Sequence, residues 1–271
     1  MSMQNWRLIN SGFQAGAMNM ALDEALLHSV ANGDSLPVLR FYRWQPATVT
    51  LGYAQSIITD LDQDVCRQAG LDVVRRSTGG RAVLHDQEVT YSVIAPLNTR
   101  LFGNSVLDCY RVISEILQKT LVGLGLPAEL VPGKPRGGHL NAMKAVCFSA
   151  PSQYELVING CKVAGSAQKR FGQTFLQHGS IPIEMDLELL GKALKVDVGD
   201  AAAASLNTVG WLNQWSAKPL VISEVEKSLA EVFAKHLQIE WVHSEPTSAE
   251  RQRARQMNDE KFGHPGWNLK R

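Results

Sequence analysis

The sequence of 271 residues predicts an α/β protein of the α+β kind, with a mixed or largely antiparallel sheet flanked by helices. Two observations support this fold class. Short segments rich in β-forming residues crowd the middle of the chain, and longer segments with apolar residues at helical spacing lie toward both ends. We expect one main domain over residues 1–240 and a short helical extension over residues 241–271 packed on it.

Helical spacing of apolar residues predicts a helix over residues 15–32. Its apolar stripe is expected to pack in the core, with Asp23, Glu24 and His28 outside that stripe. Further strands are expected at residues 6–10, 38–44, 48–51, 71–76, 89–95, 174–183 and 238–242, and further helices at residues 61–69, 105–122, 187–194, 223–236 and from residue 247 onward.

Local signals refine some of these elements. Gln45-Pro46 is expected to form a turn between two strands, and Gln177-His178-Gly179 is expected to form a bulge that faces a binding site. Capping boxes are expected at two helix starts, where Ser223 pairs with Glu226 and Thr247 pairs with Glu250.

The composition is that of an ordinary globular protein, with 45% hydrophobic and 20% charged residues. The formal net charge is +1, so any acidic partner must be bound through a local basic patch. The four cysteines lack the CxxC and Cys/His spacings of zinc sites, and no segment has the pattern of a secretion signal or a membrane span. We therefore expect a cytoplasmic monomer without a metal that binds neither nucleic acid nor membranes.

The most informative stretch, residues 144–170, contains a predicted β-hairpin. Residues 153–159 alternate apolar and polar side chains, Asn159-Gly160 is a two-residue turn signal, and Lys162 begins the returning strand. Cys147 lies shortly before this hairpin. A lysine ammonium close to its thiol would favour the thiolate, because a free cysteine has a pKa of about 8.5. Cys147 is therefore a candidate nucleophile, and a buried, inert cysteine is the alternative.

A second candidate site is the Gly79-Gly80 bend, which follows a predicted strand. Glycines let the backbone approach a ligand where a Cβ would obstruct it. The bend lacks the GxGxxG and GxxxxGK[ST] patterns of nucleotide-binding loops, and a simple tight turn is the alternative. Its charged neighbours favour a binding loop; they are Arg75, Arg76, Arg81, His85 and Asp86.

Residues 127–144 are expected to form a long loop rich in glycine and proline. Its basic side chains are either solvated or positioned to bind an acidic carrier protein. They are Lys134, Arg136, His139 and Lys144.

Together these segments resemble the biotin/lipoate ligase and octanoyltransferase superfamily over most of the chain. MNMALDEALL resembles the first helix of that superfamily, FYRWQPATVTLGYAQ its early hairpin, and RRSTGGRAVLHD its ligand-binding loop. KVAGSAQ and LQHGSI resemble the stretch that carries the family lysine, and HPGWN is also similar. The resemblance implies the catalytic-domain fold of biotin/lipoate protein ligases.

Within the superfamily, the chain resembles the cysteine-dependent octanoyltransferases of lipoate assembly. ATP-dependent lipoate ligases usually have a third glycine at the position of Arg81 and usually lack a cysteine at the position of Cys147. The segment CFSAPSQYEL, followed by Lys162, resembles the octanoyltransferases instead. In that family the cysteine carries the acyl group and the lysine lowers its pKa, which the resemblance implies for Cys147 and Lys162.

The resemblance implies transfer of an octanoyl group from octanoyl-acyl carrier protein, through a Cys147 thioester, to a lysine of a lipoyl-domain protein such as the glycine cleavage H protein. This reaction is the first step of endogenous protein lipoylation. A thioester donor is already activated, so neither ATP nor a metal cofactor is expected. The expected substrate-binding residues are Arg75, Thr78, Gly79, Gly80, Arg81, Val83, His85, Ala164, Gly165 and His178.

Roles can be assigned to some of these residues. Val83, Ala164 and Gly165 are expected to line an apolar slot for the octanoyl chain. Arg75 and Arg81 are expected to bind the phosphopantetheine phosphate of the carrier or the acidic surface of the acceptor. His85 and His178 are candidates for positioning or proton transfer, with a purely structural role as the alternative.

Three other functions fit the same sequence. The protein could move octanoyl groups between lipoyl proteins by amidotransfer through its cysteine. It could be an ATP-dependent lipoate-protein ligase, which would not need Cys147. It could also be a catalytically inactive family member that binds acylated carriers, although the presence of both Cys147 and Lys162 argues against this last function.

Overall fold

The computed structural model describes residues 3–97, 99, 101–103, 105–132, 154–195, 206 and 208–270. Its strands form one six-stranded sheet and two three-stranded sheets. The strands are β1 Gln4–Gln14, β2 Val38–Trp44, β3 Thr48–Leu51, β4 Asp72–Arg75, β5 Val83–His85, β6 Glu88–Pro96, β7 Ala128–Pro132, β8 Tyr154–Ile158, β9 Cys161–Lys162, β10 Gly165–Phe171, β11 Thr174–Pro182 and β12 Ile239–His243.

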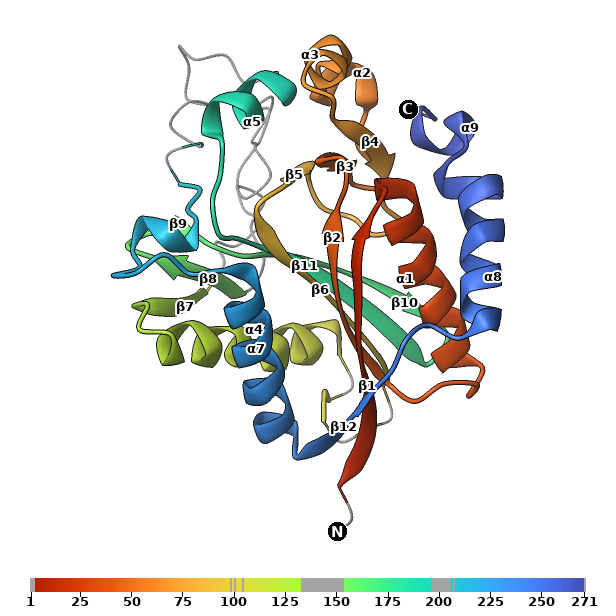
Figure 1. Ribbon diagram of the computed structural model, residues 1–271, viewed down its shortest axis with the longest axis vertical. Helices are drawn as coiled ribbons and strands as arrows, with labels where there is room; N and C mark the ends of the chain where they lie inside the picture. Colours follow the sequence, from red (N-terminus) through yellow and green to blue (C-terminus); the bar gives the residue numbers. More distant parts are fainter. Residues whose placement is uncertain are drawn as a thin grey trace.

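The helices lie around these sheets (Figure 1). Within the described ranges, none of them combines the length and apolar character needed to cross a lipid bilayer. The helices are α1 Gly16–Ala31, α2 Ile57–Asp60, α3 Gln63–Gln68, α4 Val106–Gly123, α5 Leu187–Ala193, α7 Ile222–Leu237, α8 Ser248–Met257 and α9 Pro265–Asn268.

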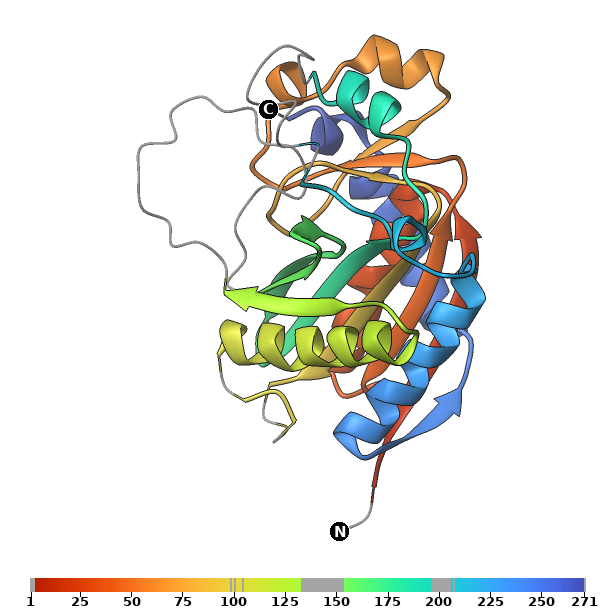
Figure 2. The same ribbon diagram turned by 90° about the vertical axis from the view of Figure 1, so that its left-hand side faces the viewer.

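The six-stranded sheet, in the order β10-β11-β6-β2-β1-β12, is the central layer of the molecule. Strand β1 runs parallel to β2 and β12, whereas β6 runs antiparallel to β2 and β11, so the sheet is mixed. Helices α1 and α8 lie on one face of the sheet, and α4 and α7 lie on the other (Figures 1 and 2). The predicted fold class, a mixed sheet flanked by helices, is confirmed.

Alternating side chains of the sheet strands build a separate core on each face, because successive residues of a strand point to opposite sides. In β2, Leu39 and Phe41 join the core with α4 and α7. Val38 and Tyr42 of the same strand join the core beneath α1. The sheet therefore supports a helical layer on both faces, and the functional cavity described below lies along β10 and β11 near one end of it.

Helix α1 confirms the helix predicted over residues 15–32, but the placement of its charged residues was wrong. Asp23 and Glu24 are buried, because α1 packs against the sheet on one side and against α8 and the π-helix Asn258–Phe262 that follows it on another. Buried carboxylates need partners. Asp23 pairs with Arg40 at 2.7 Å, and Glu24 binds the ammonium groups of two lysines, Lys261 at 2.6 Å and Lys169 at 3.2 Å.

Three local predictions also need correction. Strands β2 and β3 match the predicted ranges but do not form a hairpin, because β3 pairs with β4 and β5 in a separate sheet. Gln177-His178-Gly179 forms no bulge, since β11 keeps a continuous register with both β6 and β10 there. Strand β7 occupies part of the predicted loop over residues 127–144, whose basic residues Lys134, Arg136, His139 and Lys144 lie outside the described residues.

The predicted capping boxes had different outcomes. Thr247 and Glu250 form the expected box at the start of α8, with hydrogen bonds in both directions. The Ser223–Glu226 box was wrong, because α7 begins one residue earlier and Glu224 accepts the Val221 N–H instead. Glu226 is buried and pairs with the guanidinium of Arg43 at 3.4 Å, which places it against the sheet.

The C-terminal segment ends against the start of the Gly79-Gly80 loop. The buried Arg75 side chain donates hydrogen bonds to the carbonyl oxygens of Trp267 (3.2 Å) and Asn268 (3.0 Å). In return, the Trp267 indole N–H donates to the Arg75 carbonyl (2.8 Å), and the Arg75 N–H donates to Asn268 Oδ1 (2.9 Å). These reciprocal bonds tie α9 to β4, where Figure 1 shows the C-terminus.

Replacing Trp267 with alanine is expected to lower the free energy of unfolding by about 2 kcal/mol, because a half-buried ring and a buried-carbonyl hydrogen bond are lost. Chemical denaturation of the full chain measures this change. Trp267→Phe is the matched control, since it keeps a ring and loses only the indole N–H, at a cost of about 1 kcal/mol. An alanine variant as stable as the wild type would show that the tail does not contribute to the stability of β4.

Candidate active site

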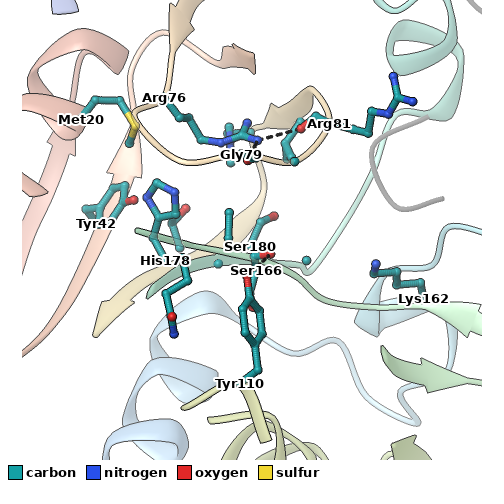
Figure 3. A pocket seen from close by; sticks show the side chains of 18 of the residues that line it. Met20, Tyr42, Arg76, Gly79, Arg81, Tyr110, Lys162, Ser166, His178 and Ser180 are labelled. Carbon is teal, nitrogen blue, oxygen red and sulfur yellow. Dashed lines mark hydrogen bonds between the residues drawn. The ribbon is translucent and has the colours of Figure 1, made fainter. Parts of the chain in front are cut away.

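A cavity of about 330 Å³ lies along β10 and β11, within the size range of small-molecule sites. In Figure 3 the loop carrying Gly79 and Arg81 lies on one side of it, and Tyr110 of α4 on the opposite side. Met20 and Tyr42 lie at one end and Lys162 at the other. Among the predicted residues, those that line the cavity are Lys162, Gly79, Gly80, Arg81, Val83, His85, Gly165 and His178.

Other predicted site residues lie elsewhere. Arg75 is fully buried and binds backbone carbonyls, which leaves its side chain away from the cavity lining. Thr78 and Ala164 are also buried and are not among the described residues that line the cavity. Cys147 lies outside the described residues. The expected phosphate-binding role is therefore compatible with Arg81 but not with the position of Arg75.

Close backbone contacts shape the Gly79-Gly80 loop. A Cβ on Gly52, just after β3, would collide with the carbonyl oxygen of Gly80, so only glycine lets the loop pack here. Gly80 has a φ of 95°, a conformation that favours glycine. Arg76 donates to the carbonyl oxygens of Gly79 (3.0 Å) and Arg81 (2.8 Å). Arg76 therefore holds the loop in place through hydrogen bonds to two of its carbonyl oxygens.

Glu88 is the centre of a buried polar cluster at the cavity. Its carboxylate accepts hydrogen bonds from the hydroxyl groups of Thr90 and Ser180 and from the Trp44 indole N–H at 3.2 Å. His85 Nδ1 lies 2.7 Å from the same carboxylate, and the imidazole stacks on Trp44 with a centroid distance of 4.2 Å. These contacts leave His85 in a single orientation.

A second buried cluster surrounds His178. His178 Nε2 lies 2.8 Å from Thr78 Oγ1, and its Nδ1 lies 3.3 Å from Asp23 Oδ2. Burial lowers the pKa of His178 below its ordinary value, although the Asp23 carboxylate opposes this effect. Burial would raise the pKa of Asp23, but Arg40 and His178 outweigh it and hold that pKa below its ordinary value. The cluster is therefore a neutral imidazole beside an ionised carboxylate.

The predicted hairpin positions Lys162. Strands β8 and β9 pair with Val157 opposite Lys162, and Asn159 (φ 49°) and Gly160 (φ 80°) form the turn, which confirms the hairpin. The Lys162 side chain is 10% exposed, and its ammonium lies 3.2 Å from Glu155 Oε1. A buried hairpin strand thus presents a cation at the end of the cavity.

The other cysteines differ in their suitability as nucleophiles. Burial, together with the Asp62 carboxylate, raises the pKa of Cys66 to about 11, and burial also raises the pKa of Cys109. Both thiols are therefore protonated near neutral pH and poorly reactive. Cys161 is partly exposed in β9, directly before Lys162.

The sequence prediction missed several residues of the cavity. Tyr110 was not among the predicted site residues, but it lines the cavity, and its hydroxyl donates to the Ser166 carbonyl at 3.3 Å. Burial raises the pKa of Tyr91 to about 12, and its hydroxyl bonds to Ser166. Gly179 makes room for the Tyr91 ring, 2.6 Å from where a Cβ would lie. The glycine in LQHGSI was the only sequence signal for this packing.

Comparisons with known sequences identify a family and several relatives of this chain. A family profile described as the lipoyl protein ligase A/B catalytic domain matches residues 15–234. Octanoyltransferase LipM of Carboxydothermus hydrogenoformans is 38% identical over 269 residues, which cover 98% of this chain and 98% of that protein. Octanoyltransferase LipM of Staphylococcus aureus is 38% identical over 274 residues, covering 97% of this chain and 98% of that protein.

Solved structures share the fold. The crystal structure of lipoate-protein ligase A bound with ATP has a TM-score of 0.80 at 26% identity and covers 99% of both chains. A bipartite lipoate protein ligase from Thermoplasma acidophilum has a TM-score of 0.79 at 27% identity, covering 99% of this chain and 97% of that one. The chain therefore belongs to the lipoyl protein ligase A/B catalytic-domain family, where it is an acyltransferase of the octanoyltransferase group.

Proposed function

We propose that this protein transfers an octanoyl group from octanoyl-acyl carrier protein to a lysine of a lipoyl-domain protein, with Cys147 as the acyl carrier. The glycine cleavage H protein is the acceptor that we propose. The observation that supports this function most strongly is the position of Lys162, whose ammonium lies at the end of the cavity on the hairpin that follows Cys147. The octanoyltransferase names of relatives at 38% identity support the same reaction class.

The described residues next to the segment that carries Cys147 lie beside the cavity. Pro132 and Tyr154, which flank that segment, are paired neighbours in β7 and β8. A small hollow lined by Tyr154 also contacts Tyr110 and Ser166, which line the cavity. These neighbours support the assignment of Cys147 to this cavity.

Two acyl transfers make up the proposed reaction. The Cys147 thiolate attacks the octanoyl carbonyl, the bond to the carrier sulfur breaks, and the carrier leaves as a thiolate that takes up a proton. The neutral amine of the acceptor lysine then attacks the new thioester, the Cys147 thiolate leaves, and the amine loses a proton as the amide forms. The first transfer exchanges one thioester for another, and the second gives a more stable amide. Neither step needs ATP or a metal.

Lys162 and Arg81 have separate proposed roles. The Lys162 ammonium stabilises the thiolate of Cys147 and the negative charge that develops on the acyl oxygen. The guanidinium of Arg81 lies at the same end of the cavity as Lys162 in Figure 3. Arginine binds phosphate well, so we assign Arg81 to the phosphopantetheine phosphate of the carrier.

Intact-mass spectrometry of the purified protein with octanoyl-acyl carrier protein, without ATP, tests the proposal. We expect one adduct of about 126 Da, by atomic masses, that peptide mapping places on Cys147 and that apo H protein discharges. If the acceptor is modified only when free octanoic acid and ATP are supplied, the proposal is contradicted and the protein is a ligase. An adduct formed from an octanoylated lipoyl protein, but not from the acyl carrier protein, would identify an amidotransferase. Binding of the acylated carrier without any adduct would identify a catalytically inactive binder.

Replacing Lys162 with methionine is expected to lower the rate of Cys147 acylation at pH 7 by about 10- to 30-fold, because a nearby cation lowers a thiol pKa by about 1–3 units and a thiol with a pKa of about 8.5 is only about 3% ionised at pH 7. The rate of Cys147 alkylation by iodoacetamide as a function of pH measures that pKa directly. Lys162→Arg, which keeps the charge, should retain a lowered pKa, and the exposed Lys192→Met should match the wild type. An unchanged alkylation profile in Lys162→Met would contradict the role of Lys162.

A further inference from the structure

Arg76 lines the cavity, yet acceptors within the protein use all of its donors. A guanidinium has five N–H groups. Nη2 donates to the carbonyl oxygens of Gly79 and Arg81, as described above. Nη1 donates to the Thr50 carbonyl oxygen (2.9 Å) and to Thr50 Oγ1 (2.5 Å), and Nε donates to Thr78 Oγ1 (3.4 Å). No N–H of Arg76 is left for a substrate, so its contacts serve the loop.

Thr50 links Arg76 to His85. Arginine can only donate, so Thr50 Oγ1 accepts from Arg76 and has one proton to give. His85 Nδ1 faces the Glu88 carboxylate, which accepts, so Nδ1 carries a proton and donates to Glu88 Oε1 at 2.7 Å. His85 Nε2, 2.8 Å from Thr50 Oγ1, can then accept the Thr50 proton.

The same argument applies to His178. Its Nδ1 faces the Asp23 carboxylate, which accepts, so Nδ1 carries the proton of the neutral imidazole. Thr78 Oγ1 accepts from Arg76 Nε, and His178 Nε2 can accept the Thr78 proton. Arg40 and the hydroxyl groups of Tyr42 and Ser92 hold Asp23 in turn. The charged and titratable groups around His178 are Asp23 from α1, Arg40 and Tyr42 from β2, Arg76 from the loop and His85 from β5.

We infer that two relays, Asp23–His178–Thr78 and Glu88–His85–Thr50, converge on Arg76 and position the Gly79–Arg81 wall of the cavity. In this arrangement His85 and His178 are positioning residues, and neither donates nor removes a proton in the reaction. The inference deepens the proposed function and rests on it for the activity measurements, but not for the measurements of loop structure.

Protonation of His178 would change the hydrogen bond to Thr78. A proton on Nε2 converts that atom from an acceptor into a donor, so the Thr78 hydroxyl can no longer donate to it and must reorient. Because burial lowers the pKa of His178, this change is expected below the ordinary titration range of histidine.

Histidine-to-glutamine variants separate positioning from proton transfer. In His85→Gln and His178→Gln the amide oxygen can accept the threonine proton as Nε2 does, and the amide does not titrate. We expect kcat within about threefold of the wild type in both variants, and a flatter acidic limb of the rate profile in His178→Gln. A kcat lower by about 100-fold or more in either variant, the range of general acid–base catalysis, would overturn the inference for that histidine.

Threonine variants test the loop itself without any substrate. Hydrogen exchange of peptides covering residues 76–85 is measured by mass spectrometry on the full chain. Thr50→Val and Thr78→Val remove the hydroxyl at nearly constant volume, and we expect faster exchange confined to these peptides. Thr50→Ser and Thr78→Ser keep the hydroxyl and should exchange as the wild type does. If these peptides exchange hydrogen at the wild-type rate in both valine variants, the inference is overturned.

Kinetics with octanoyl-acyl carrier protein complete the test. The valine variants should raise KM by about tenfold with little change in kcat, and the serine variants should restore it. A fall in kcat with KM unchanged would overturn the positioning role. If the wild-type protein proves inactive with this donor, the proposed function fails, and the hydrogen exchange of the loop still decides the inference.

Discussion

Replacing Cys147 with alanine is expected to lower octanoyl transfer by about 10⁴-fold or more, because the covalent intermediate can no longer form. The acceptor lysine would have to attack the carrier thioester directly in an active site arranged for two steps. The steady-state rate of octanoyl transfer to apo H protein measures this loss. Intact-mass spectrometry of the variant should show no octanoyl adduct. The variant should keep the stability of the wild type, as checked by thermal unfolding.

Cys161→Ser is the matched control for this prediction. Cys161 is partly exposed and lies next to Lys162 in β9, so it is the described cysteine best placed to act as an alternative nucleophile. We expect the serine variant to form the adduct and to transfer octanoyl groups within about twofold of the wild type. Transfer that survives in Cys147→Ala and disappears in Cys161→Ser would assign the chemistry to Cys161 instead.

Elements with strong local signals could be predicted from the sequence. The Asn159-Gly160 turn has the residues that a two-residue hairpin needs, and the structure confirms it with both residues at positive φ. The strands predicted over residues 38–44 and 48–51 match β2 and β3 to the residue. Which strands they pair with is a long-range property, and the expected hairpin between them was wrong for that reason.

The errors at the site have the same origin. Arg75 and Arg76 are neighbours near the end of a strand, so their side chains point to opposite sides. The alternation does not say which side meets the cavity. In the structure Arg75 binds Trp267 and Asn268, which are distant in sequence, and Arg76 binds the loop. Asp23 was likewise placed outside the core because its partner Arg40 lies on another element.

Replacing Asp23 with alanine is expected to lower the free energy of unfolding by about 3–5 kcal/mol, because it leaves the fully buried Arg40 guanidinium without its counter-charge. Tyr42 and Ser92 would also lose a hydrogen-bond acceptor. Chemical denaturation at pH 7 measures the loss. Asp64→Ala is the control, because Asp64 and Arg67 form an exposed pair that contributes less than about 1 kcal/mol. Equal stabilities of the two variants would contradict the argument.

The pH dependence of stability provides a second test of the same buried pair. The pKa of Asp23 is held below its ordinary value of 3.8, so its stabilisation is complete above pH 3.8 and is lost as the pH falls through the folded-state pKa. The pKa of His178 is lowered from 6.5 by burial, so the unfolded chain binds that proton more readily and stability falls as the pH drops below 6.5.

Burial also lowers the pKa of His28 and His236, so their protonation also lowers the stability as the pH falls. A comparison with His178→Gln is therefore needed to isolate the contribution of His178. Denaturation of both proteins at pH 7 and pH 5 makes this comparison. We expect the wild type to lose more stability over this interval than His178→Gln does, because the glutamine cannot take up a proton. Equal losses would mean that protonation of His178 does not oppose folding. The attraction of the Asp23 carboxylate would then offset the whole free-energy cost of burying the protonated imidazole of His178.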